Sequence, residues 1–308
     1  MIGKASSQNL SSPVILVTGK NGQVGWELQR SLMSIGTIVS CGRQEMDLSK
    51  TDSIVNTLRE IKPDVIVNAA AYTAVDKAEE DTTLAMQVNE VAPAVIAEEA
   101  HRLGALLIHY STDYVFDGKK TAPYSESDEA NPVSCYGRTK LAGERAIQST
   151  QADAVILRTS WVYTARAHNF LLTIFRLIQE REELRIVADQ IGAPTWARLI
   201  ADTTAHVIRQ SCYERASRNF KSDLYHMTSS GETSWHGFAK SIAEIAQTIL
   251  PDEALKLRHL EAIATHEYPT AATRPMNSRL STDKLVEHFS LKMPTWRDGL
   301  ELCMKELV

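Results

Sequence analysis

A run of three evenly spaced glycines constrains the fold of this chain more than any other feature. Gly19, Gly22 and Gly25 follow the apolar run Val14–Thr18 and lead directly into a helical pattern that continues to Leu32. Glycines after a strand permit positive φ and a close approach of the backbone to a ligand. The helix that follows points its free N–H groups at a phosphate. The motif therefore favours a dinucleotide site over a simple tight turn.

The first half of the chain alternates short apolar runs with helical stretches. Strands are expected at 14–18, 37–42, 64–71, 105–111 and 154–163, and helices at 53–61, 88–103 and 136–148. Such alternation is typical of a parallel sheet covered on both faces, and right-handed crossovers leave few topologies. We predict an α/β fold, a doubly wound (Rossmann) parallel sheet with a smaller, interleaved C-terminal substrate-binding lobe.

The pattern loosens after Tyr163, and this change sets the expected domain boundaries. Residues 1–12 are expected to form a disordered leader, because they contain no continuous apolar core. The dinucleotide-binding domain is expected over 13–165, with later pieces near 196–230 returning to it. The substrate-binding lobe is then formed by 166–195 and 231–308.

Composition excludes several classes of function. A net charge of -5 over 308 residues argues against a nucleic-acid partner. No apolar run is long enough to span a bilayer, so we expect no membrane insertion and a cytoplasmic location. The cysteines have no metal-ligand spacing, and we predict no metal site from them; they are Cys41, Cys135, Cys212 and Cys303.

Tyr136 and Lys140 lie one helical turn apart in the stretch YGRTK. A tyrosine is a poor acid unless its pKa of roughly 10 is lowered, and a nearby ammonium group does this. We predict that Tyr136 protonates the alkoxide left by hydride transfer, while Lys140 lowers its pKa and holds the nicotinamide ribose. Thr112 follows the run 105–111 at a strand end, where its hydroxyl can donate to the substrate carbonyl. A local turn hydrogen bond is its structural alternative.

The end of the second expected strand bears on the choice of cofactor. In NAD-preferring folds an acid at this point binds the ribose 2′-hydroxyl. Here the sequence is Cys41-Gly42-Arg43, with no acid, and Arg43 can pair with a 2′-phosphate. We therefore predict NADPH as the preferred cofactor, with NADH and a merely solvated Arg43 as the alternatives.

The chain resembles the dTDP-4-dehydrorhamnose reductase family of extended short-chain dehydrogenase/reductases over about residues 14–300. Seven stretches, in order, carry the resemblance: GKNGQVGWELQRSL, KPDVIVNAAAYTAVDKAE, HYSTDYVFDG, YGRTKLAGE, RTSWVY, DQIGAPTWA and RPMNSRL. It implies NAD(P)H-dependent reduction of the 4-keto group of dTDP-4-dehydro-6-deoxy-L-mannose to dTDP-L-rhamnose, for cell-surface polysaccharide. The segment His168–Phe170 departs from the glycine-rich loop of relatives.

The resemblance also implies residue roles. It assigns catalysis to Thr112, Tyr136 and Lys140. To the cofactor contacts Gly19, Gly22, Gly25 and Arg43 it adds Gln23, Val24, Asp47, Leu48, Ala71, Tyr72, Thr73, Tyr110, Tyr136 and Lys140. The substrate contacts that it implies are Thr112, Asp113, Trp161 and Arg274. A homodimer with Mg²⁺ at its interface is left open by the resemblance.

Four alternative functions remain open at this point. Nucleotide-sugar dehydratases need an acid pair directly after the catalytic threonine, whereas here Asp113 is followed by Tyr114, so elimination is disfavoured. Another nucleotide-sugar reductase or an epimerase would share most of these residues. A non-catalytic NADP-binding regulatory subunit would also share the fold, but the intact Thr112, Tyr136 and Lys140 favour an enzyme.

Overall fold

The computed structural model describes residues 12–307, so the expected leader lies outside the described residues except for Ser12. A six-stranded sheet with every neighbouring pair parallel forms its centre, in the order β10-β5-β4-β3-β1-β2. The strands are β1 (Val14–Thr18), β2 (Thr37–Cys41), β3 (Val65–Asn68), β4 (Leu106–Thr112), β5 (Ala154–Thr159) and β10 (Asp223–His226). The predicted doubly wound sheet is confirmed.

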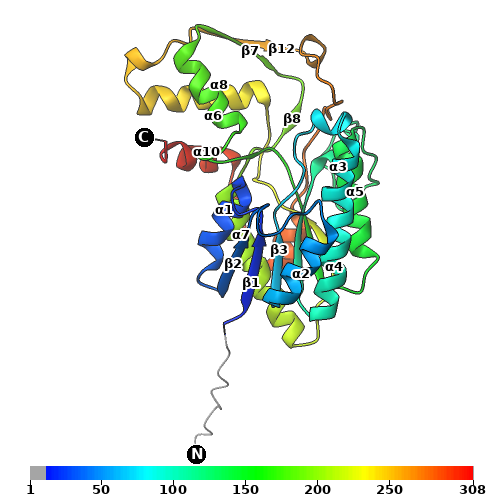
Figure 1. The fold of residues 1–308 in the computed structure, drawn as a ribbon. Helices are drawn as coiled ribbons and strands as arrows, with labels where there is room; N and C mark the ends of the chain where they lie inside the picture. Colours follow the sequence, from blue (N-terminus) through cyan, green and yellow to red (C-terminus); the bar gives the residue numbers. More distant parts are fainter. Residues whose placement is uncertain (1–11, 308) are drawn as a thin grey trace, which may run out of the picture.

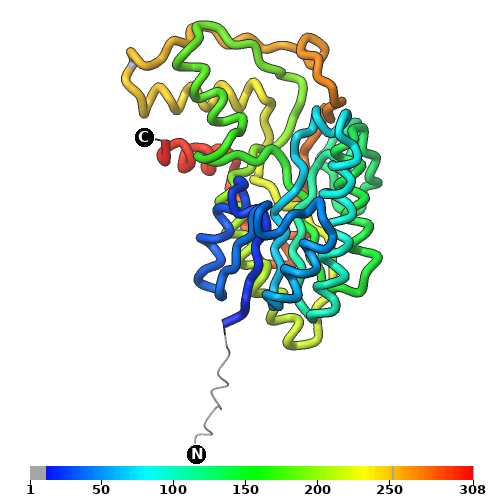
Figure 2. Tube along the Cα trace, in the orientation of Figure 1, coloured from blue at the N-terminus to red at the C-terminus, as the bar shows by residue number. Residues whose placement is uncertain are grey.

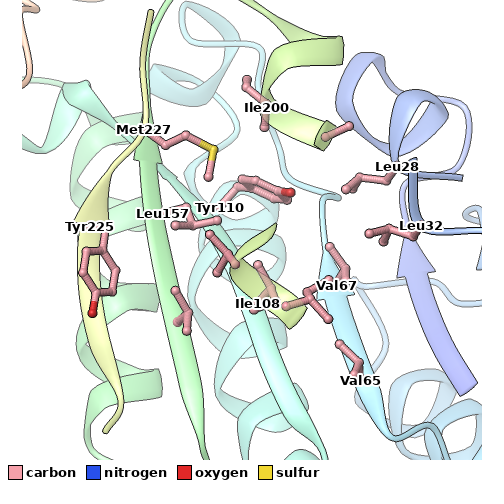
Figure 3. Close-up of a cluster of buried hydrophobic side chains, with 14 of the residues drawn as sticks. Leu28, Leu32, Val65, Val67, Ile108, Tyr110, Leu157, Ile200, Tyr225 and Met227 are labelled. Atoms are coloured by element: carbon pink, nitrogen blue, oxygen red, sulfur yellow. The ribbon is translucent and has the colours of Figure 1, made fainter. Parts of the chain in front are cut away.

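Helices cover both faces of this sheet (Figure 1). One face carries α1 (Gln23–Leu32), α7 (Ala197–Ala216) and α9 (Asp283–Phe289), and the other carries α2 (Thr51–Ile61), α4 (Ala92–Leu103) and α5 (Cys135–Gln148). Figure 3 shows the first of these two cores, in which Leu28 and Ile200 from the helices meet Val67 and Ile108 from the strands. The strand order reverses at β1, so the gap between β1 and β3 is the switch point where such sheets bind ligands.

A second layer of structure lies beyond the carboxyl ends of the strands, visible at the top of the tube in Figure 2. It contains α6 (Phe170–Glu180), α8 (Trp235–Ile249), α10 (Trp296–Met304) and the parallel pair β7 (Glu183–Val187) and β12 (His259–Ile263). Its own core includes Tyr163, Leu171, Phe238 and Leu300, all buried. The domain boundaries given above remain a prediction.

The remaining elements are short. Two-residue strands are β6 (Val162–Tyr163), β8 (Ile191–Gly192), β9 (Thr195–Trp196) and β11 (Thr233–Ser234). Single 3-10 turns lie at Lys77–Glu79, Asp113–Val115, Asp252–Ala254 and Thr265–Glu267. Within residues 12–307, none of the helices combines the length and apolar character needed to cross a membrane.

Three expected elements differ from the structure by more than two residues at one end. The strand expected at 64–71 ends at Asn68, where β3 stops. The strand expected at 154–163 stops at Thr159, because Trp161 has φ of 48° and turns the chain before β6. The helix expected at 88–103 begins earlier, as α3 (Thr82–Met86) followed by a π-helical turn (Gln87–Val91) and then α4. Pro93 lies in the first turn of α4, and its ring would clash with the carbonyl of Asn89 in a regular helix. The wider π turn accommodates that clash.

Candidate active site

A pocket of about 600 Å³ opens at the carboxyl ends of β1 to β5. Its lining brings together nearly the whole predicted cofactor-binding set, with Gly25 as the exception. These lining residues are Gly19, Gly22, Gln23, Val24, Arg43, Asp47, Leu48, Ala71, Tyr72, Thr73, Tyr110, Tyr136 and Lys140. The pocket therefore lies at the switch point of the sheet and over the start of α1.

The glycine turn forms the floor of this pocket. Gly19 has φ of 73°, and the N–H of Gly22 donates to the Gly19 carbonyl at 2.8 Å. Gly22 precedes α1 without any side-chain cap, so the first N–H groups of that helix face the pocket. Among the described residues, three buried oxygens in the lining find no hydrogen-bond partner: Gln23 Oε1, Ser111 Oγ and Thr159 Oγ1. Such unpaired groups fit a site built for a polar ligand such as a dinucleotide.

Gly25 packs closely against this turn but does not line the pocket. A Cβ at Gly25 would lie 2.1 Å from the Gly19 carbonyl oxygen, so an alanine must displace either the turn or the start of α1. We expect Gly25→Ala to weaken dinucleotide binding about tenfold or more, equivalent to about 1.4 kcal/mol, measured by fluorescence titration. Gly104→Asn is the control, since Gly104 has open space around it and asparagine tolerates its left-handed φ. Equal affinity in the wild type and Gly25→Ala would contradict this prediction.

At the end of β2, the structure corrects one inference drawn from the sequence. No acid directly ends β2, but the structure brings Glu45 back to this position. Its carboxylate accepts the Gly42 N–H at 2.8 Å and pairs with Lys20 Nζ at 2.6 Å. Arg43 lines the pocket, is 76% exposed, and approaches Asp47 only at 3.7 Å. The pocket therefore has an exposed guanidinium group, and an acid that sequence spacing did not reveal lies beside it at the end of β2.

Tyr136 is half-buried in the pocket wall, in the first turn of α5. The Ser134 side chain caps this helix by accepting the Gly137 N–H at 3.1 Å. Burial raises the pKa of Tyr136 well above its ordinary value, and the neighbouring Thr112 side chain opposes this only in part. The prediction that Lys140 lowers this pKa is thus wrong for the structure as it stands. A phenol that stays protonated is nevertheless the form needed to give a proton away.

Lys140 is only 2% exposed. Its Nζ donates to the Tyr110 carbonyl oxygen at 2.6 Å and lies 3.4 Å from His109 Nε2. Burial lowers the pKa of Lys140 to about 8. Tyr110 also lines the pocket. Its hydroxyl forms a hydrogen bond of 2.6 Å with the Thr204 hydroxyl, and its ring belongs to the core shown in Figure 3.

Thr112 and Asp113 lie just beyond the pocket lining. The Thr112 hydroxyl donates to Asp113 Oδ1 at 3.1 Å and accepts the Tyr114 N–H at 3.2 Å, the turn bond named as its alternative role. Burial raises the pKa of Asp113 to about 6. The Thr112 proton is therefore held locally, beside Tyr136.

The other two predicted substrate contacts lie outside the pocket lining. Trp161 stacks on Trp235 with ring centroids 3.6 Å apart and packs against Gly192. Arg274 pairs with Asp76 at 2.8 Å and reaches the Tyr114 hydroxyl at 3.4 Å. Both residues are thus engaged within the protein.

The sequence did not reveal the side chain that positions the segment at residues 71–73. Asn89, in the π turn, accepts the Tyr72 N–H at 2.9 Å and donates to the Tyr72 carbonyl at 3.1 Å. Its Nδ2 also reaches Thr139 Oγ1 on α5 at 3.2 Å. Asn89 therefore links residues 71–73 to α5. Single π turns are frequent at functional sites. No local sequence signal marked Asn89.

Further lining residues were not predicted. They are Thr18, Gly42, Met46, Ser49, Ala69, Ala70, Leu84, Val88, Ser111, Thr159, Val162, Ala167 and His168. Those at strand ends could have been found from the rule that ligands bind beyond the carboxyl ends of strands. Leu84 and Val88 come from a helix whose start was missed. Among residues 12–307, no group of three His, Cys, Asp or Glu side chains is placed to hold a metal ion.

Comparison with known proteins adds independent information. A family model described as "RmlD substrate binding domain" matches residues 13–308. The chain is 50% identical to a dTDP-4-dehydrorhamnose reductase of Burkholderia thailandensis, over 96% of this chain and 99% of that protein. It is 45% identical to the enzyme of that name from Escherichia coli K12, over 95% and 97%.

Solved structures agree with these matches. The crystal structure of dTDP-4-dehydrorhamnose reductase from Bacillus anthracis in complex with NADP superposes with a TM-score of 0.85 at 33% identity. The similarity covers 96% of this chain and 99% of that one. Both sequence and structure therefore match over nearly their full lengths.

Proposed function

The chain belongs to the dTDP-4-dehydrorhamnose reductase family, and we propose that Thr112, Tyr136 and Lys140 carry its chemistry. The enzyme is an NADPH-dependent oxidoreductase that reduces the 4-keto group of dTDP-4-dehydro-6-deoxy-L-mannose to give dTDP-L-rhamnose. The observation that supports this residue assignment best is the half-buried Tyr136 in the wall of the dinucleotide pocket, between Thr112 and the turn that carries Lys140.

Binding of the cofactor is assigned to the pocket floor and walls. The N–H groups at the start of α1 and the glycine turn would hold the pyrophosphate, and Lys140 would donate to the nicotinamide ribose. Residues 71–73, whose Tyr72 backbone is held by Asn89, would form a wall of this binding site. When bound, the reduced nicotinamide supplies the hydride.

The protein's own contribution is to hold the carbonyl and deliver a proton. Thr112 and Tyr136 donate hydrogen bonds to the 4-keto oxygen and stabilise the negative charge that develops there. Tyr136 then transfers its proton to this oxygen, because the alkoxide is a stronger base than the phenolate. Fixed geometry thus replaces solvent reorganisation.

The assay for this function is NADPH oxidation with dTDP-4-dehydrorhamnose, compared with the GDP and UDP analogues of the same sugar. We expect oxidation with one NADPH consumed per product, and the highest kcat/KM with the dTDP substrate. Tight retention of the dinucleotide on gel filtration, with no net oxidation, would point to an epimerase instead.

Arg43 is proposed as the partner of the NADPH 2′-phosphate. It lines the pocket and approaches its nearest carboxylate, Asp47, only at 3.7 Å. We expect Arg43→Gln to lower kcat/KM for NADPH about tenfold, or about 1.4 kcal/mol, with little change for NADH. Lys50→Gln is the matched control, since Lys50 also lies 3.7 Å from Asp47 but does not line the pocket. An equal loss with both cofactors would exclude this role.

Several features remain proposals. We propose a homodimer, with Mg²⁺ at its interface as an additional option, and a cytoplasmic location. The substrate contacts of Asp113, Trp161 and Arg274 also remain proposals. Arg274 would have to exchange its ion pair with Asp76 for the substrate diphosphate.

A further inference from the structure

A continuous chain of buried polar groups runs beneath the pocket from the glycine turn to Lys140. The Ala70 N–H donates to Thr18 Oγ1 at 3.1 Å, and Thr18 Oγ1 donates to Asn68 Oδ1 at 2.7 Å. Asn68 Nδ2 lies 3.0 Å from His109 Nδ1, and His109 Nε2 lies 3.4 Å from Lys140 Nζ. The four side chains come from β1, β3, β4 and α5 and are between 1% and 2% exposed.

The direction of donation along this chain is fixed at one end. A backbone N–H can only donate, so Thr18 Oγ1 accepts from Ala70. Among the described residues, Asn68 Oδ1 is the only acceptor within hydrogen-bond distance of the buried Thr18 hydroxyl, so its proton is directed there. The Asn68 amide then turns its NH₂ group toward His109, whose Nδ1 must accept. A neutral imidazole that accepts at Nδ1 carries its proton at Nε2. That proton faces Lys140 Nζ.

The charged and neutral forms of Lys140 respond differently to this arrangement. A neutral amine has one lone pair, which can accept from His109 Nε2–H while a hydrogen donates to the Tyr110 carbonyl. An ammonium group has only donors and would oppose the imidazole N–H. We propose that Thr18, Asn68 and His109 are positioning residues that fix this tautomer and so weaken the hold of Lys140 on its third proton. The consequence for catalysis rests on the function proposed above.

The other groups facing Lys140 do not replace this effect. Glu144, one turn further along α5, favours the ammonium form, but its carboxylate is bound by Arg158 at 2.6 and 2.9 Å. Tyr136 is neutral, because burial raises its pKa. Burial and the nearby Lys140 lower the pKa of His109 well below its ordinary value, so the ring stays uncharged. The lowered pKa of Lys140, about 8, is consistent with the proposal.

The tautomer can be measured without any substrate. In enzyme labelled with ¹⁵N-histidine, the shifts of the two ring nitrogens distinguish the Nε2–H from the Nδ1–H form, and His109→Gln assigns the signal. We expect the wild type and Thr18→Ser to show Nε2–H. Thr18→Val has nearly the same shape but no hydroxyl, so Asn68 is free to turn and we expect the Nδ1–H form to gain population. An Nδ1–H tautomer in the wild type would overturn the proposal, even if Thr18→Val failed to fold.

The pH profile tests the consequence for Lys140. We expect kcat/KM of the wild type to fall as pH rises through about 8, where the ammonium form is lost. In Thr18→Val, His109 Nε2 can accept from the ammonium group, so this alkaline limb should move up by about one pH unit, whereas Thr18→Ser keeps the wild-type position. A changed tautomer with an unmoved limb would refute the link to Lys140. If no nucleotide sugar were reduced, the proposed function would fail. The NMR result would still test whether the hydrogen bonds from Thr18 to His109 fix the tautomer.

Discussion

Tyr136→Phe is expected to lower kcat by about 10²- to 10⁴-fold, because removal of the phenolic proton leaves the alkoxide without a positioned acid. The ring stays in place beside Tyr114, whose ring centroid lies 5.6 Å away, so the pocket keeps its shape. The affinity for NADPH should therefore persist, since the glycine turn and Lys140 are untouched. Steady-state turnover and a separate fluorescence titration of NADPH measure these two effects independently.

Tyr225→Phe is the matched control for this variant. It also removes a buried tyrosine hydroxyl, but Tyr225 lies on β10 and does not line the pocket. Near-wild-type turnover is expected for the control. If Tyr136→Phe turned over at the same rate as Tyr225→Phe, another group would have to be the proton donor. A loss of NADPH affinity that equals the loss of turnover would instead indicate a structural role for Tyr136.

Most of the pocket could be predicted from sequence, because its residues follow strands that are themselves easy to recognise. Strands β1, β3 and β4 are buried on both faces and therefore show as continuous apolar runs. Parallel strands bring their carboxyl ends to one edge, so residues after each run converge there. This rule, with the family resemblance, placed Gly22, Ala71 and Tyr110 in one pocket.

What sequence could not predict depends on side-chain direction. Spacing places Lys140 one turn from Tyr136, but not the tilt that sends its ammonium group to the Tyr110 carbonyl. Glu45 reaches the end of β2 only because the chain folds back over Gly42. The Asn89 contacts depend on a π turn, which has no simple periodic signature. In each case a tertiary contact decides where a polar group points.

The buried ion pair between Glu144 and Arg158 should be the most sensitive point for stability near the catalytic helix. Their side chains are 1% and 6% exposed, and two hydrogen bonds of 2.6 and 2.9 Å join them. Arg158 also lies over the Phe116 ring at 5.0 Å, with little water to solvate its charge. Replacing one partner leaves the other as an uncompensated buried charge, which costs far more than the pair contributes.

We therefore expect Glu144→Gln to lower the free energy of unfolding by about 3–5 kcal/mol, measured by urea denaturation. Glu244→Gln is the control, because the Glu244–Arg297 pair is half exposed and should contribute less than about 1 kcal/mol.

The Glu144 carboxylate also favours the ammonium form of Lys140, so its loss should lower the pKa of Lys140 and move the alkaline limb of kcat/KM downward. Thr18→Val is expected to move the same limb upward, and opposite shifts in the two variants would assign it to Lys140. If both variants left the limb in place, its pKa would belong to another group.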